Sequence, residues 1–256
     1  MSTRYKSYMI CTSPRSGSTL LCRLLAATGV AGHPDSHFHR PSLEAWQKSF
    51  GLSQGRNEPE SLQAVFASAI HKGRGETGIF GLRMQRPSFA FFLEKLGVLY
   101  PGMDSDRARI EQAFGRTLFI HLTREDKVAQ AVSYVKARQS GLWHVAPDGS
   151  DIERTAPFRK PDYDSTAIGE WYTSMLTFDR DWTAWFERQG VKPLTLTYDA
   201  LSQAPQATLA SVLTELGRDP ALADTLQTPT QKMADAHSDA WVRRFRAEIE
   251  RDQLTA

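Results

Sequence analysis

Short apolar runs alternate along this chain with longer segments whose apolar residues recur every three to four positions. Four runs have the length of buried strands, at residues 8–11, 79–84, 117–122 and 193–197. The helical spacing predicts helices around residues 20–25, 89–96, 128–135, 168–186, 207–216 and 239–251. Strands that alternate with helices predict an α/β fold with a central, mostly parallel sheet. Right-handed crossovers then bring the carboxyl ends of the strands to one edge, where such sheets bind ligands.

Two long stretches interrupt this pattern. Residues 32–55 and 141–166 are polar and lack a clear period, apart from a short helical segment at 43–50. Loops of this length in a compact domain are often lids or binding loops. Both stretches are therefore candidates for a place beside a ligand.

Composition narrows the class of protein. The 256 residues are 41% hydrophobic and 23% charged, with a formal net charge of +2, and we expect one domain over residues 1–256. The small positive excess suits an anionic ligand and argues against a nucleic-acid partner, which requires basic stripes. No run approaches the roughly 18 apolar residues of a membrane span, and the first residues lack the apolar stretch of a signal peptide. Cys11 and Cys22 make no disulfide framework, so a cytoplasmic setting is expected.

The segment Ser13-Pro14-Arg15-Ser16-Gly17-Ser18-Thr19, called the first loop below, joins the first strand to the first helix. Arg15 supplies a permanent cation, the serines and Thr19 supply hydroxyls, and Gly17 lets the backbone approach a ligand closely. The following helix directs free N–H groups and its positive dipole end to the same place. These features predict an anion site; the alternative is a helix capped by a serine beside an exposed Arg15. A nucleotide-triphosphate loop matches less well, because it needs a second glycine and a lysine after it.

Three residues further along the chain are expected at the same edge of the sheet. Arg124 follows the third strand, Ser133 lies nine residues later on the next helix, and Tyr198 ends the fourth strand. An arginine and a serine hydroxyl can clamp a second phosphate, and a tyrosine can lie against an adenine. The alternative is that Arg124 forms a surface ion pair with Glu125 or Asp126, while Ser133 and Tyr198 only pack.

These motifs resemble those of one enzyme family. The first loop with Leu20 and Leu21 resembles the 5′-phosphosulfate loop of sulfotransferases that use 3′-phosphoadenosine-5′-phosphosulfate (PAPS), and Arg124 with Ser133 resembles their 3′-phosphate site. Residues 27–32 and 238–245 make the chain similar to the bacterial sulfotransferases typified by the mycobacterial trehalose 2-sulfotransferase.

The resemblance implies a P-loop-NTPase-like three-layer α/β fold and PAPS as the donor, with no metal. It also implies in-line transfer of a sulfuryl group to a hydroxyl of a carbohydrate or glycoconjugate, and many relatives are homodimers. On this reading residues 13–19 hold the phosphosulfate, while Arg124, Ser133 and Tyr198 hold the adenosine 3′-phosphate.

The general base is where this chain departs from the family pattern. A glutamate in the family's loop after Gly32 is replaced by Ser36, a poor base, with Asp35 and His37 on either side. We predict His37 as the base, because an unperturbed imidazole titrates near about 6.5. Arg15 is expected to act electrostatically on the leaving phosphate. Because much of this loop is replaced, trehalose is not expected as the acceptor.

Other polar residues give further predictions. Arg83, at the end of the second strand, can bind the acceptor or the sulfuryl oxygens, or form an ion pair. His33 and Trp46 can line the acceptor pocket, although Trp46 can equally pack, and Lys232 can reach the 3′-phosphate. The histidine spacing within residues 33–39 has no strong match to zinc patterns, so no metal is expected.

Two other activities stay open. One is a nucleotide-dependent kinase or NTPase of related fold, which would require magnesium and ATP. The other is a protein that binds PAPS or its product PAP without turnover, which loss of the glutamate at Ser36 would allow.

Overall fold

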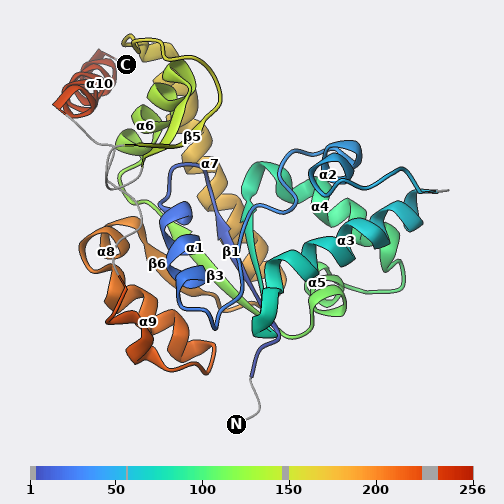
Figure 1. Cartoon of the computed structure of the whole chain (residues 1–256). Helices are drawn as coiled ribbons and strands as arrows, with labels where there is room; N and C mark the ends of the chain where they lie inside the picture. Colours follow the sequence, from blue (N-terminus) through green and yellow to red (C-terminus); the bar gives the residue numbers. More distant parts are fainter. Residues whose placement is uncertain (1–3, 56, 146–149, 227–235, 256) are drawn as a thin grey trace.

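A four-stranded sheet lies at the centre of the chain (Figure 1). The computed structural model describes residues 4–55, 57–145, 150–226 and 236–255, so Lys232 lies outside the described residues. The strands stand in the order β2-β1-β3-β6, and all neighbours are parallel. Their bounds are Ser7–Thr12 for β1, Phe80–Gln85 for β2, Thr117–Thr123 for β3 and Leu194–Thr197 for β6. The predicted parallel α/β fold is confirmed.

Helices cover both faces of this sheet, because side chains alternate between its faces. In β1, Tyr8 and Ile10 point to one face, while Met9 and Cys11 point to the other. The first face carries α1 (Ser18–Ala27), α8 (Tyr198–Gln203) and α9 (Pro205–Glu215). The second carries α2 (Leu43–Ser49), α3 (Glu58–Arg74), α4 (Arg86–Leu99), α5 (Asp106–Phe114) and the carboxyl half of α7 (Ser165–Arg188). Short 3-10 helices η1 (Gly75–Thr77) and η2 (Pro220–Ala223) complete these layers.

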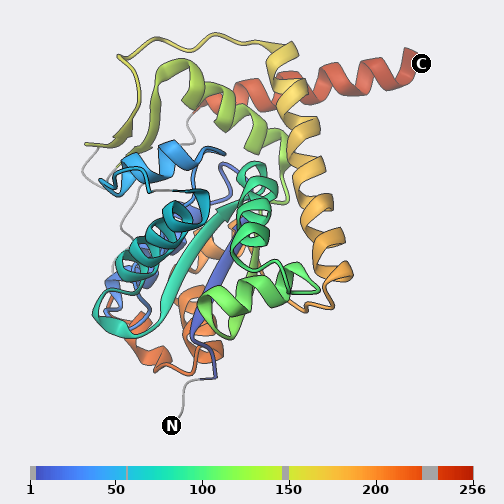
Figure 2. The ribbon, with the colours of Figure 1, turned by 90° about the vertical axis from the view of Figure 1, so that its right-hand side faces the viewer.

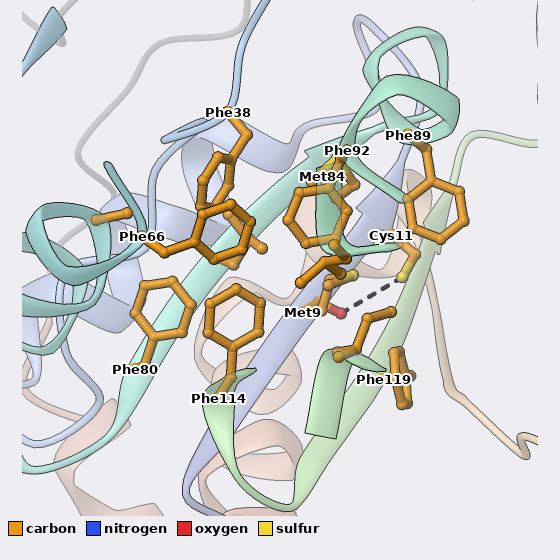
Figure 3. Packing of buried hydrophobic residues seen from close by; sticks show 14 of the residues in the cluster. Met9, Cys11, Phe38, Phe66, Phe80, Met84, Phe89, Phe92, Phe114 and Phe119 are labelled. Carbon is orange, nitrogen blue, oxygen red and sulfur yellow. Dashed lines mark hydrogen bonds between the residues drawn. The ribbon is translucent and has the colours of Figure 1, made fainter. Parts of the chain in front are cut away.

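Aromatic rings fill the second face (Figure 3). Phe80 of β2 packs on Phe114 at the end of α5 with ring centroids 4.7 Å apart, and Phe38 lies at the same separation from Phe66 of α3. Phe38 is 1% exposed. Its burial anchors the polar stretch that follows α1, so that the residues just before it are held against β2.

A separate apolar group lies beyond one edge of the sheet. It joins α6 (Lys127–Ser140), the amino half of α7 and α10 (Ala236–Thr255) through Val132, Ile168, Trp241 and Phe245. Figure 2 shows α10 crossing near the amino end of the long α7. None of the described helices is both long enough and apolar enough to cross a membrane.

The structure adds elements that the apolar pattern did not predict. Residues 142–154 contain an antiparallel pair, β4 (Leu142–Val145) and β5 (Asp151–Arg154), inside the stretch expected to be irregular. Each strand is only four residues long, and β5 is mostly polar, so neither gives a clear alternating pattern. Helices α3 and α5 were also not predicted, although each begins at a capping residue: Asn57 accepts from the Glu60 N–H, and Ser105 from the Ala108 N–H.

Candidate active site

The first loop follows β1, the strand at which the order of strands in the sheet reverses. β1 pairs with β2 on one side and with β3 on the other, which is the position where open parallel sheets bind ligands. Arg15 has φ 64° and Gly17 has φ 85°. A left-handed conformation is costly for a residue with a side chain, and such costs concentrate at functional sites. The backbone of this loop is therefore held in an unusual shape by its surroundings.

Two buried side chains fix that shape. Trp182 of α7 donates from Nε1 to the Thr12 carbonyl at 2.9 Å. Gln130 of α6 donates from Nε2 to Ser13 Oγ at 2.9 Å and to the Pro14 carbonyl at 2.6 Å. The Gln130 side chain is fully buried. The sequence does not reveal this role of Gln130, because the role depends on how α6 packs beside the first loop.

Gly17 is required by the ring of Tyr198. A Cβ at Gly17 would lie 2.7 Å from Tyr198 Cδ2, which leaves no room for a side chain. The other neighbour of this ring is Arg124, whose Cζ lies 4.5 Å from the ring centroid. The predicted adenine residue, the predicted phosphate residue and the first loop are therefore in contact.

The side chain of Arg15 reaches α6, the helix that carries Ser133. Its Nε donates to Ser133 Oγ at 3.0 Å, and Arg124 donates from Nη1 to the Arg15 carbonyl at 3.5 Å. Burial and the neighbouring charge of Arg124 lower the pKa of Arg15 to about 10, so it stays protonated at neutral pH. Burial also lowers the pKa of Arg124. Two largely buried cations this close favour binding of an anion.

A second group of polar residues meets the loop from the β2 side. Arg83 donates from Nη1 to Thr19 Oγ1 at 2.7 Å and from Nε to Ser36 Oγ at 2.8 Å. Its Nη2 lies 3.3 Å from Asp35 Oδ1. Asp35 also forms an isolated parallel bridge with Leu82 of β2. Arg83 therefore connects the first loop to the stretch in which the base was predicted.

His37 points away from this group. Its ring is 6% exposed and lies between Phe80 and Phe50, with centroid separations of 6.0 and 6.3 Å. A Cβ on Gly73 would meet its Nε2 at 2.7 Å. Burial lowers the pKa of His37 to about 4, so the ring is neutral at pH 7. Its role as the base stays a prediction, but these neighbours are apolar packing partners.

Of the three residues predicted on the acceptor side, Arg83 contacts the first loop, whereas His33 and Trp46 have other neighbours. The ring of His33 covers Gly75, whose Cβ would meet it at 2.5 Å. Trp46 is fully buried, donates from Nε1 to the Arg40 carbonyl at 2.7 Å and packs against Phe38. Packing accounts for Trp46 in this structure without an acceptor contact.

Strand β4 of the β4–β5 hairpin also contacts the first loop. The Trp143 carbonyl accepts a hydrogen bond from Arg15 Nη1, and His144 Nε2 lies 3.0 Å from Thr19 Oγ1. Neither residue was predicted at the site. The stretch 141–166 was expected to be a lid or binding loop, and its strands do lie on the first loop.

Together these residues can hold two anionic groups of one ligand. Arg15 and the start of α1 face one position, Arg124 and Ser133 lie beside it, and Arg83 adds a further cation. Among the residues that the structure describes, no group of three or more His, Cys, Asp or Glu side chains is placed to hold a metal ion. The chemistry that these residues can supply is charge stabilisation of a phosphate-like ligand.

The chain belongs to the Stf0 sulfotransferase family, whose model matches residues 7–248, and it is therefore an enzyme of the sulfotransferase class. It is 30% identical to the trehalose 2-sulfotransferase of Mycobacterium tuberculosis, over 98% of both chains. It is 29% identical to the trehalose 2-sulfotransferase of Mycolicibacterium smegmatis, over 99% of both. A solved sulfotransferase from Alicyclobacillus acidocaldarius is 16% identical, with a TM-score of 0.43 over 96% of this chain and 92% of that one, too distant to bear on function. The predicted family is confirmed.

Proposed function

We propose that this sulfotransferase takes a sulfuryl group from PAPS and transfers it in line to a hydroxyl of a carbohydrate or glycoconjugate. One observation carries the proposal: Arg15, Arg124, Ser133 and Tyr198 come from three separate parts of the chain and meet at the carboxyl end of β1. A donor with a 5′-phosphosulfate, a 3′-phosphate and an adenine would match this set of cations, hydroxyls and one aromatic ring.

Each residue then has a chemical task. Arg15, the N–H groups at the start of α1 and the hydroxyls of Ser18 and Thr19 stabilise the charge that develops on the leaving phosphate. Arg15 acts electrostatically, because a guanidinium does not readily give up a proton. Arg124 and Ser133 hold the 3′-phosphate, and Tyr198 lies against the adenine.

The acceptor hydroxyl would bind beside Arg83 and Ser36. Arg83 bonds to Thr19 and to Ser36, so a hydroxyl held there would lie next to the residues that hold the sulfuryl group. The names of the two mycobacterial relatives favour a carbohydrate. The replaced loop at residues 33–39 is the reason to expect an acceptor other than trehalose, so trehalose belongs in the test.

The test is a transfer assay in the presence of EDTA with radiolabelled PAPS. The acceptors are trehalose, other mono- and disaccharides, and lipid-linked glycans. We expect a labelled product with at least one of them and thermal stabilisation by PAP. Stabilisation by ATP with magnesium, but not by PAP, would instead indicate a kinase or NTPase. PAP binding without any transfer would indicate a binding protein. A cytoplasmic setting, a homodimer and one domain over residues 1–256 stay predictions.

A further inference from the structure

His144 is the histidine that the structure brings into contact with the first loop. It lies in β4, and its Nε2 is 3.0 Å from Thr19 Oγ1 and 3.5 Å from Glu153 Oε2 in β5. Its side chain is 24% exposed, so it is sheltered but still open to a ligand. The pairing of His144 with Glu153 across the two strands sets the position of the ring.

The contacts of Thr19 are compatible with a neutral His144 ring whose Nε2 carries no proton. Arg83 Nη1 is a donor only, so the oxygen of Thr19 accepts from it at 2.7 Å. The Thr19 hydroxyl hydrogen can then be donated to His144 Nε2 when the ring is the neutral tautomer with its proton on Nδ1. In that tautomer His144 presents a lone pair to the place where the first loop and Arg83 meet.

The residues first considered as bases are less well placed. The Asp35 carboxylate accepts from the Ser36 N–H at 2.7 Å and pairs with Arg83. Ser36 accepts from Arg83 through its hydroxyl, and His37 is enclosed by Phe80, Phe50 and Gly73. Among the described candidates, His144 combines a lone pair, access and contact with the loop.

We propose that His144 is the general base that takes the proton of the acceptor hydroxyl, an inference that rests on the proposed function. The acceptor oxygen forms a bond to sulfur as its proton passes to His144 Nε2. The bond between sulfur and the bridging phosphate oxygen breaks, and its electron pair stays on the PAP formed. The protonated ring then lies beside the Glu153 carboxylate, which stabilises the positive charge.

The charges around His144 make its pKa depend on whether the donor is bound. Burial, followed by the charges of Arg15, Arg83 and Arg23, lowers the pKa of His144 to about 3. A bound phosphosulfate brings negative charge among the same arginines, which raises the pKa of the ring toward its usual range. His144 is therefore neutral before the donor binds and becomes a stronger base once the donor is in place.

The test compares His144→Gln with His144→Glu, which have nearly the same shape but differ in the ability to take a proton. The assay uses radiolabelled PAPS with the acceptor that the wild type sulfates fastest, and PAP binding is measured by calorimetry. His71→Gln, an exposed histidine on α3, is the control. Circular dichroism and thermal unfolding confirm that each variant is folded.

We expect His144→Gln to lower kcat by about 100-fold or more while the Kd for PAP changes by no more than about threefold. His144→Glu should recover at least about tenfold of that loss, because it restores a base. His71→Gln should match the wild type.

Three results would overturn the assignment: a His144→Gln enzyme within about threefold of wild-type kcat, equal rates for Glu and Gln, or PAP binding weakened as much as kcat. A wild-type protein that neither binds PAP nor transfers sulfate would instead overturn the proposed function, and this assignment with it.

Discussion

The Arg15 guanidinium donates to the Ser133 hydroxyl at 3.0 Å and so joins the first loop to α6. If this pair serves the donor, Arg15→Ala should weaken PAP binding by about 2–4 kcal/mol, or roughly 30- to 1,000-fold, because a largely buried cation is lost from an anion site. Calorimetry with PAP measures the change. Arg243→Ala, at an exposed arginine of α10, is the control and should leave the Kd unchanged. Equal Kd values for the two variants would remove Arg15 from the donor site.

Gly17→Ala should damage both stability and donor binding. The added Cβ would lie 2.7 Å from the Tyr198 ring, and φ is 85°. We expect the free energy of unfolding to fall by about 1–3 kcal/mol. Urea unfolding measures it. Gly29→Ala is the matched control, since its φ is 67° but no atom lies within 4 Å of the added Cβ. The excess loss at Gly17 over Gly29 reports the contact with Tyr198, and no excess would contradict it.

Trp182→Phe should loosen the start of the first loop. The change removes the hydrogen bond to the Thr12 carbonyl while keeping a large ring in the core. A buried acceptor left without this donor costs about 1–3 kcal/mol. Trp171→Phe is the comparison, because Trp171 is half-buried and packs on Tyr134 through its ring. Chemical unfolding of the two variants should show the larger loss at Trp182; similar losses would mean that the bond to Thr12 contributes little.

The buried histidine His37 should make the fold sensitive to acid. Its folded pKa, about 4, is below the ordinary value near 6.5, so the unfolded chain binds the extra proton first. Stability is therefore fully present above about pH 6.5 and is lost as the pH falls toward 4, with about 2 kcal/mol gone by pH 5. His37→Gln should reduce this dependence between pH 7 and pH 5 in urea unfolding. An unchanged dependence would show that His37 is not the group that titrates.

The central fold and the first loop could be predicted because both depend on short-range patterns. The four apolar runs became the four parallel strands, and the loop between the first run and the next helix became the centre of the site. Arg124, Ser133 and Tyr198 were expected at the same edge, since parallel strands bring their carboxyl ends together.

What could not be predicted depends on the direction in which single side chains point. Ser36 bonds to Arg83, which in turn bonds to Thr19, whereas the ring of His37, the next residue in the chain, lies between Phe80 and Phe50. The partners of the first loop on α6 and β4, Gln130 and His144, lie 110 or more residues away and are joined to it by polar contacts. No apolar period marks such contacts.

The parallel pairing of β1 has a consequence for how this protein acquires its function. β1 pairs with strands that begin at Phe80 and Thr117, and the loop after it is completed by residues as distant as Tyr198. Such long-range pairing folds slowly, because large loops must close before any contact forms. A shortened chain that ends before β6 would lack the ring that covers Gly17, so the contacts of the first loop are complete only after the last strand of the sheet is in place.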